Sequence, residues 1–185
     1  MIRTYQPQLV PDLPQTEDVA RVLQRLSHPT ESVLDIERRV ALQMTRQEIL
    51  TAPGAPQLWA VIGQAALWRL VECSALREQI RQLIAMVQLP HVRIQVLPVY
   101  SGENVALGGP LTILRFVDHE LPNVVYIQQQ TTVLYLDRDE DVHYRALLDH
   151  VFTLATPPTQ TSNYLNSFLA KCERLHEGAC LPDAE

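Results

Sequence analysis

Residues 92–116, VRIQVLPVYSGENVALGGPLTILRF, and residues 124–128, VVYIQ, decide the fold class of this chain. At the start of the longer stretch, apolar residues alternate with Arg93 and Gln95, which is the period-2 pattern of a strand with one strongly buried face. Residues 111–117, LTILRFV, and VVYIQ are two further apolar runs. Only a short turn separates them, which favours an antiparallel pair of strands.

The segments around this stretch complete a mixed sheet. LWAVI at residues 58–62 is a short apolar run bounded by breakers, as expected of a buried strand, and TVLYL at residues 132–136 extends the antiparallel meander. An apolar stripe before residue 92 predicts a crossover helix that Ser74 can cap and that Pro90 ends. We therefore predict an α/β (α+β) fold with a mixed, partly antiparallel sheet packed with helices, and with helical segments at both ends.

The N-terminal part is expected to be helical after an extended start. Three prolines between residues 7 and 14 predict a lead-in without a helix. Thr16 has the character of an N-cap for a helix that ends near Ser27. A second helix is expected over about residues 31–50, with a buried stripe of apolar residues at helical spacing. That stripe consists of Val33, Ile36, Val40 and Met44.

The chain is divided into three parts. Residues 1–53 hold the lead-in and two helices, which would serve as a linker or in dimerisation. Residues 54–156 form the α/β core. Residues 157–185 hold a C-terminal helix and tail, in which apolar residues recur at helical spacing up to Cys172.

The composition argues against several classes of protein. With a net charge of -6, the chain lacks the basic excess of phosphate binders, so direct binding to nucleic acid is disfavoured. No apolar run approaches the roughly 18–20 residues that span a bilayer. The three cysteines form no CxxC pair and the N-terminus lacks a secretory signal, so we expect reduced thiols and a cytoplasmic location.

Few motifs point to catalysis, and we expect neither a metal nor a cofactor. His143 and His150 lie seven residues apart, whereas metal ligands on one helix prefer four, so both are interpreted as surface residues. Gly108 and Gly109 precede Pro110 at the mouth of a strand. They either form a tight turn or let backbone N–H groups approach a ligand.

Polar residues inside apolar segments are the best candidates for a binding site. Gln64 follows LWAVIG, Arg69 lies within ALWRLV, and Tyr126 and Gln128 alternate with apolar residues in VVYIQ. A buried amide or guanidinium needs hydrogen-bond partners, so such positions either form a structural network or line a pocket. The residues alone favour neither alternative.

Six segments carry a resemblance to a known family: YQPQLVPDLPQTED, RQEIL, LWAVI, REQIRQLI, VRIQVLPVYSGENVALGGPLTILRF and VVYIQ. In this order and spacing they resemble the C-terminal domain of XRE-type helix-turn-helix transcriptional regulators of high-GC Gram-positive bacteria, often described as antitoxin-like. The resemblance covers about residues 46–152 and, more loosely, the chain from Tyr5. In that family the domain is thought to sense a signal or a small partner protein. The resemblance therefore implies that residues 54–156 act as a sensor.

The chain departs from the family pattern at three places. No helix-turn-helix precedes Tyr5, so we expect no direct DNA binding by this chain alone. The family motif PGLLQT reads PDLPQT at residues 11–16. Gln64 and Gln128 stand where the family usually has glutamates. The electrostatics of a site formed with Arg69 would therefore differ, because an amide neither pairs ionically nor acts as a base.

We expect a regulatory domain that binds a small-molecule ligand or a small partner protein and forms a homodimer through its N-terminal helices. The alternative is a cofactor-independent enzyme of secondary metabolism, for example a cyclase that folds an apolar intermediate. Amides at two positions would hydrogen-bond the ligand, and a guanidinium would anchor a polar or anionic group. The expected ligand site consists of Gln64, Arg69, Tyr100, Gly108, Gly109, Tyr126 and Gln128.

Overall fold

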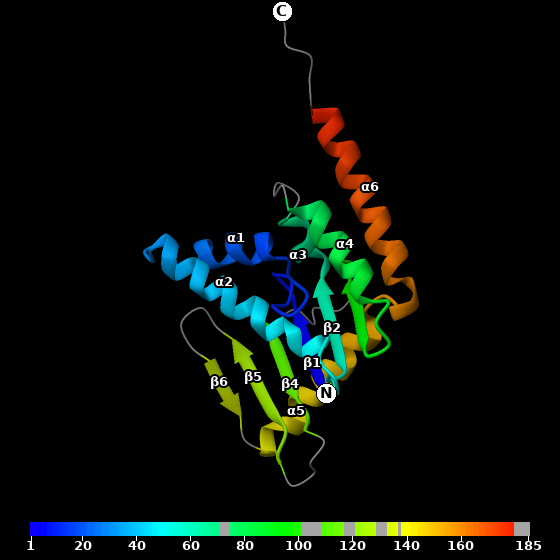
Figure 1. Ribbon diagram of the computed structural model, residues 1–185. Coiled ribbons are helices and arrows are strands. Elements are labelled where there is room, and N and C mark those ends of the chain that lie inside the picture. The colour runs from blue at the N-terminus through cyan, green and yellow to red at the C-terminus, as the bar shows by residue number, and fades with distance from the viewer. Residues whose placement is uncertain (71–74, 101–108, 117–120, 129–132, 137, 180–185) are drawn as a thin grey trace, which may run out of the picture.

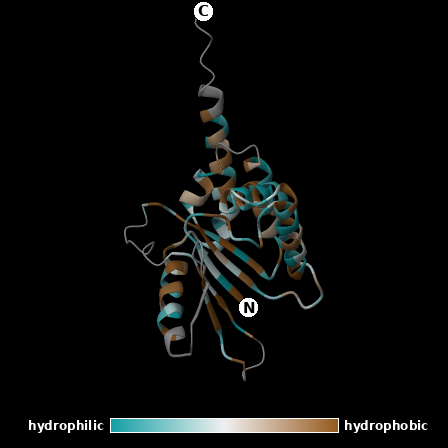
Figure 2. Ribbon diagram, turned by 90° about the vertical axis from the view of Figure 1, so that its left-hand side faces the viewer, coloured by the Kyte–Doolittle hydropathy of each residue, from teal (hydrophilic) through white to brown (hydrophobic). Residues whose placement is uncertain are grey.

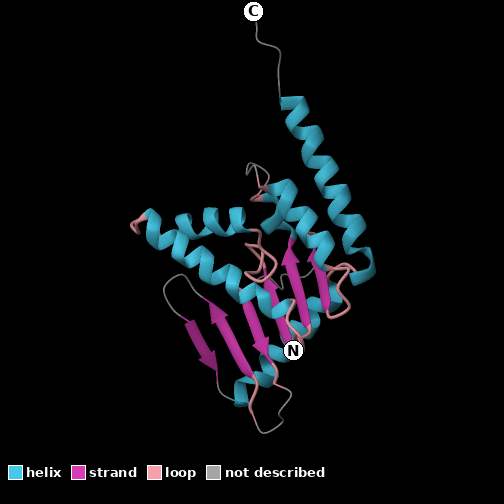
Figure 3. Ribbon diagram, in the orientation of Figure 1, coloured by secondary structure: helices cyan, strands magenta, loops and turns pink. Residues whose placement is uncertain are grey.

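A six-stranded mixed sheet carries helices on both of its faces (Figures 1 and 3). A computed structural model describes residues 1–70, 75–100, 109–116, 121–128, 133–136 and 138–179. The strands follow the order β3-β2-β1-β4-β5-β6 across the sheet. Their bounds are Ile2–Gln6 (β1), Leu58–Gly63 (β2), Val92–Leu97 (β3), Leu111–Leu114 (β4), Val124–Gln128 (β5) and Val133–Leu136 (β6).

The directions of the strands confirm the predicted mixed sheet. Strands β1, β2 and β3 are parallel, so the connection into β3 is the expected crossover. Strands β4, β5 and β6 form the expected antiparallel meander, and β4 is antiparallel to β1. Because two reversals separate β5 from β1, the carboxyl end of β5 lies at the same edge of the sheet as the carboxyl ends of β1, β2 and β3.

Strand β1 is the largest difference from the sequence-based expectation, which placed only an extended lead-in there. It lies in the middle of the sheet, where Ile2 pairs with Leu58 on one side and with Leu114 on the other. Five residues followed by a proline give a weak strand signal, and both partners are far away in sequence. The division of the chain at residues 53 and 156 stays a prediction, although this central strand comes from the first part.

The helices largely follow the predicted periodicity. Thr16 caps α1, with its hydroxyl oxygen accepting a hydrogen bond from the Val19 N–H, and Ser32 caps α2 in the same way. The predicted cap Ser74 lies outside the described residues. No described helix is long and apolar enough to cross a bilayer. The bounds are Glu17–Ser27 (α1), Val33–Gln47 (α2), Gln64–Trp68 (α3), Leu76–Met86 (α4), Arg138–Leu154 (α5) and Thr161–Ala179 (α6).

Two hydrophobic clusters lie on opposite faces of the sheet. On one face, Leu58, Ala60 and Ile62 of β2 pack in a cluster with residues of α1, α3, α4 and α6. On the other face, Val61 of the same strand packs in a cluster with α5, for example with Leu148. Figure 2 shows the sheet between these two helical layers, with hydrophobic residues along the strands and in stripes on the helices. Successive side chains of β2 therefore point to opposite faces of the sheet and contribute to two separate cores.

Helices α1 and α2 form a hairpin that extends away from the sheet (Figure 1), and we call it the arm. It has a small core of its own, in which Ala20 packs against Ile36 and Val40, with Met44 beside them. Val33 was also predicted in the buried stripe, but it is 68% exposed, so this prediction was wrong. Val33 is the first residue of α2, at the tip of the arm, where the hairpin offers little surface to cover it.

Replacing Gly63 by alanine is expected to lower the free energy of unfolding by about 2–3 kcal/mol, the scale of an overpacked interior. A Cβ atom at Gly63 would lie 2.5 Å from the carbonyl oxygen of Pro7 and 2.9 Å from its Cα, and backbone moves aside at high cost. Urea denaturation measures the change. Gly54→Ala is the control: a Cβ there meets no atom within 4 Å, so only its positive φ of 77° costs energy, about 1 kcal/mol. Equal losses would contradict the close approach of Pro7 to β2.

Candidate ligand-binding site

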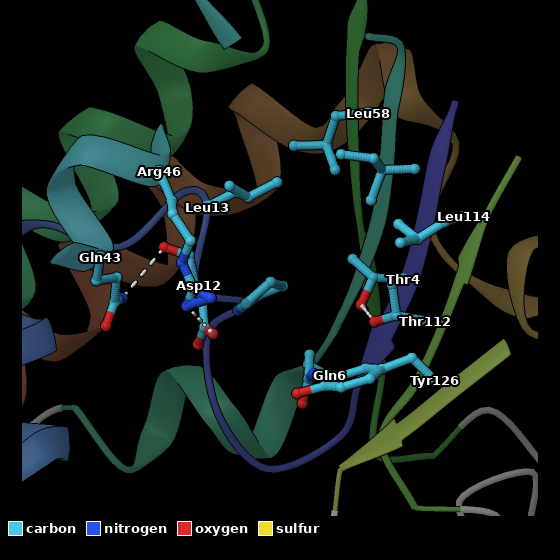
Figure 4. Close-up of a pocket in the computed structure, with 12 residues that line it drawn as sticks. Thr4, Gln6, Asp12, Leu13, Gln43, Arg46, Leu58, Thr112, Leu114 and Tyr126 are labelled. Atoms are coloured by element: carbon cyan, nitrogen blue, oxygen red, sulfur yellow. Dashed lines mark hydrogen bonds and ion pairs between the residues drawn. The ribbon is translucent and has the colours of Figure 1, made fainter. Parts of the chain in front are cut away.

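A cavity of about 360 Å³ lies between the sheet and the base of the arm (Figure 4). Its floor is a face of the sheet, built by alternate residues of β1, β2, β4 and β5. Its opposite wall is formed by residues 11–13 and by the last turns of α2. Residues 11–13 belong to the loop at residues 10–16, between β1 and α1. The lining residues are Ile2, Thr4, Gln6, Pro11, Asp12, Leu13, Gln43, Arg46, Leu58, Thr112, Leu114 and Tyr126.

One end of the floor is aliphatic. Ile2 pairs with Leu58 of β2 and with Leu114 of β4, so three aliphatic side chains lie in one row across the sheet. Leu13 adds a fourth from the opposite wall (Figure 4). This end can therefore hold an apolar group away from water.

Polar groups occupy the rest of the floor. Thr4 and Thr112 pair across β1 and β4, with their Oγ1 atoms 2.7 Å apart, and Tyr126 pairs with Thr112 on β5. Gln6 lies two residues beyond Thr4 and therefore on the same face. Within the described part of the chain, the side-chain amide of Gln6 forms no hydrogen bond. Its donors and acceptor are thus available to a ligand.

Two charged side chains face the cavity from the wall opposite the sheet (Figure 4). Asp12 comes from the loop and Arg46 from α2, and their Oδ2 and Nη2 atoms lie 3.9 Å apart. This is an ion pair, but the distance is too long for a hydrogen bond. Protein around Asp12 displaces bulk water and raises the pKa of its carboxyl, and the positive charge of Arg46 partly offsets the rise.

Glutamine side chains from α2 hold the loop in place. The loop belongs to neither a strand nor a helix, so its backbone carbonyls need other donors. Gln47 donates to the carbonyl oxygens of Asp12 and Gln15, both at 2.8 Å. Gln43 donates to the side-chain oxygen of Gln15 at 2.6 Å and to the Asp12 carbonyl at 3.3 Å. These bonds tie α2 to the loop.

A glutamine from α4 holds the same loop from the other side. Gln79 is completely buried: its side-chain oxygen accepts from the Thr16 N–H at 2.8 Å, and its nitrogen donates to the Pro14 carbonyl at 2.7 Å. Gln82 donates to the Gln15 carbonyl at 3.0 Å. The loop is thus a bridge between the arm and the helical layer on the sheet, and it carries Asp12 on its cavity side.

Three of the predicted site residues lie near the carboxyl ends of β2 and β3 rather than in the cavity. Gln64 begins α3, and its side-chain oxygen accepts from the Val99 N–H at 2.9 Å. Arg69 donates to the Gln8 carbonyl at 3.4 Å. Tyr100 is 94% exposed. Gln64 and Arg69 hold backbone here, and the ligand contacts proposed for these three residues stay a prediction.

Of the other four predicted residues, Tyr126 alone is among the residues that line the cavity. Gly109 adopts a positive φ of 69°, which fits the tight turn that was one of the two alternatives. Gly108 lies outside the described residues. Gln128 ends β5, where its backbone pairs with Val133. Tyr126 therefore faces the proposed site. Ligand contacts at Gly108, Gly109 and Gln128 stay a prediction.

The sequence analysis missed most of the cavity. Thr4 and Gln6 lie on the strand that was not predicted, and the sequence marks Asp12 only as a departure from the family motif. The glutamines had a usable signal, since Gln43 and Gln47 are four residues apart and therefore on the same face of a helix. Such spacing predicts that the two amides face the same neighbour, but it does not identify the segment of backbone that they bind.

Titratable side chains do not suggest a metal centre. Among the described residues, no three His, Cys, Asp or Glu side chains gather as metal ligands would. His143 and His150 are exposed on α5, as predicted. The expected absence of a cofactor stays a prediction.

Comparison with known proteins gives a family. A family model described as a domain of unknown function, DUF5753, matches residues 1–167. No curated protein and no solved structure matches the chain. The matched range includes the whole cavity, the arm and both helical layers except for residues 168–179 of α6.

Replacing Gln79 by leucine is expected to lower the free energy of unfolding by about 1–3 kcal/mol, because the buried Thr16 N–H loses its acceptor. The Pro14 carbonyl loses its shorter hydrogen bond and keeps only the one from Gln82 at 3.5 Å. Gln82→Leu is the matched control, since Gln82 is one turn away, half-buried and bonded to carbonyl oxygens alone. Urea denaturation measures both variants. A loss for Gln79→Leu no larger than that for Gln82→Leu would show that the loop is held in another way.

Proposed function

The chain belongs to the DUF5753 family, and we propose that it acts as a regulatory domain that senses a small-molecule ligand. The cavity between the sheet and the arm carries this proposal. Its volume falls within the roughly 300–1,000 Å³ of small-molecule sites, and it combines apolar walls with a few converging polar groups. A small partner protein remains the other signal that such a domain would read.

The arrangement of the two walls supports sensing rather than mere binding. One wall is the sheet, whose opposite face packs against α5. The other wall is formed by the loop and by α2, and hydrogen bonds from Gln43 and Gln47 of α2 connect the two. A ligand that touches Thr4 on one wall and Arg46 on the other would therefore set the position of the arm relative to the sheet. The arm would carry the response to a partner.

A relationship to XRE-type regulators is part of the same proposal. The segments YQPQLVPDLPQTED and RQEIL carry the resemblance, and they contain Asp12 and Arg46 of the cavity wall. We propose a cytoplasmic domain of this kind that does not itself bind nucleic acid, in keeping with its net charge of -6. A cofactor-independent cyclase would use the same apolar floor, and the experiment below separates the two.

Native mass spectrometry of the protein after incubation with extract of its source cells is expected to show a small-molecule adduct. Leu114→Trp should remove it, because the larger ring would fill the aliphatic end of the cavity. Leu175→Trp, at an exposed position on α6 outside the cavity and the arm, is the control and should retain the adduct. An adduct that survives in Leu114→Trp would place the ligand elsewhere. Release of a chemically altered molecule would favour the enzyme.

The homodimer is proposed to form through the tip of the arm. Leu26 and Leu34 are exposed there, and the ion pairs Asp35–Arg38 and Glu31–Arg39 beside them carry both signs of charge, so two copies can meet without net repulsion. Sedimentation at micromolar concentration should show a dimer. Leu34→Glu should give a monomer, and Leu175→Glu on α6 should not. A wild-type monomer at high micromolar concentration would contradict the dimer.

A further inference from the structure

We propose that the ligand of the cavity is a small zwitterion with an apolar tail, such as an apolar α-amino acid. Its ammonium group would lie against Asp12, its carboxylate against Arg46, and its side chain on the row formed by Ile2, Leu58 and Leu114. This inference rests on the proposed function, since it specifies the chemical class of the sensed molecule.

The spacing of the two charges favours a ligand that carries both signs. Asp12 and Arg46 are 3.9 Å apart and come from different elements, and their side chains are 56% and 62% exposed. Each therefore retains hydrogen-bonding capacity. A simple cation drawn to Asp12 would meet the repulsion of Arg46, and a simple anion at Arg46 would meet that of Asp12. A zwitterion places an opposite charge against each residue and avoids both repulsions.

The floor of the cavity sets the orientation of such a ligand. The aliphatic row lies at the Ile2 end of β1, and Gln6 and Tyr126 lie toward the other end (Figure 4). Asp12 and Arg46 face the polar part from the opposite wall. A molecule with its charged head at Asp12 and its tail toward Leu58 would match polar with polar groups and apolar with apolar groups, so neither a charge nor a polar atom would be buried without a partner.

The size of the cavity favours a single residue over a long peptide. A volume of about 360 Å³ is near the lower end of small-molecule sites. Thr4 and Thr112 pair with each other across the middle of the floor, and the amide of Gln6 lies beyond them. These neutral groups can hydrogen-bond a carboxylate or an ammonium without favouring either. The charge selectivity therefore depends on Asp12 and Arg46.

Isothermal titration with three isosteric probes tests the inference. L-Leucine carries both charges, 4-methylpentanoate lacks the ammonium and 3-methylbutan-1-amine lacks the carboxylate. Leucine should bind to the wild-type protein at least about tenfold more tightly than either truncated probe, the scale of one charge-assisted hydrogen bond. Asp12→Asn should weaken the binding of leucine by a similar factor and leave the binding of 4-methylpentanoate no weaker. Arg46→Gln should weaken the binding of leucine and leave the binding of 3-methylbutan-1-amine no weaker.

Several results would overturn the inference. A truncated probe that binds as tightly as leucine, serine that binds as well as leucine, or variants that bind all probes like the wild type would each contradict it. Thermal unfolding of Asp12→Asn and Arg46→Gln shows whether the variants are folded, and the wild-type comparison of the three probes stands without them. An adduct of another chemical class that Leu114→Trp removes would overturn the amino-acid ligand and leave the sensing function. Absence of both leucine binding and any adduct would overturn both.

Discussion

The site depends on one constraint: the backbone carbonyl groups of the loop at residues 10–16 need hydrogen-bond donors. This proline-rich loop leaves the sheet after β1, and no strand or helix pairs the carbonyl groups of residues 10–15. Side-chain amides of Gln43, Gln47 and Gln79 supply the donors instead. A buried carbonyl without a partner costs about 1–3 kcal/mol, so these glutamines hold the loop in place, and through it the base of the arm.

The cavity follows from this way of joining the arm to the sheet. On the same face of the sheet, β2 and β3 present aliphatic residues that the α3–α4–α6 layer covers. Further along that face, β1 and β4 present Thr4, Gln6 and Thr112, which an apolar helix would bury at a cost. Since the arm is held by hydrogen bonds to the loop, it need not close on this polar surface. Space therefore remains between two walls that belong to different layers.

The sequence was sufficient to predict the elements whose pattern is local. The strand around Gln95 and the helical stripe through Ile36 and Val40 both correspond to what the structure shows, although Gln95 itself is buried, so β3 is covered on both faces there. Strand β1 was beyond such reasoning, because its identity depends on pairing with Leu58 and Leu114, not on its own five residues. The site was lost for the same reason. Its floor is made by register between distant strands, and Gln64 and Arg69, which drew attention as polar residues in apolar segments, bind backbone instead.

Amide hydrogen exchange, with and without a ligand recovered with the protein from its source cells, tests most directly whether the arm and the sheet enclose the site. Ligand binding should slow exchange in residues 10–16 and in the last turns of α2, since these form the wall of the cavity opposite the sheet. Helix α5 packs on the opposite face of the sheet and should be unaffected. Protection confined to the neighbourhood of Gln64 and Arg69, or spread equally over α5, would contradict a ligand site beneath the arm.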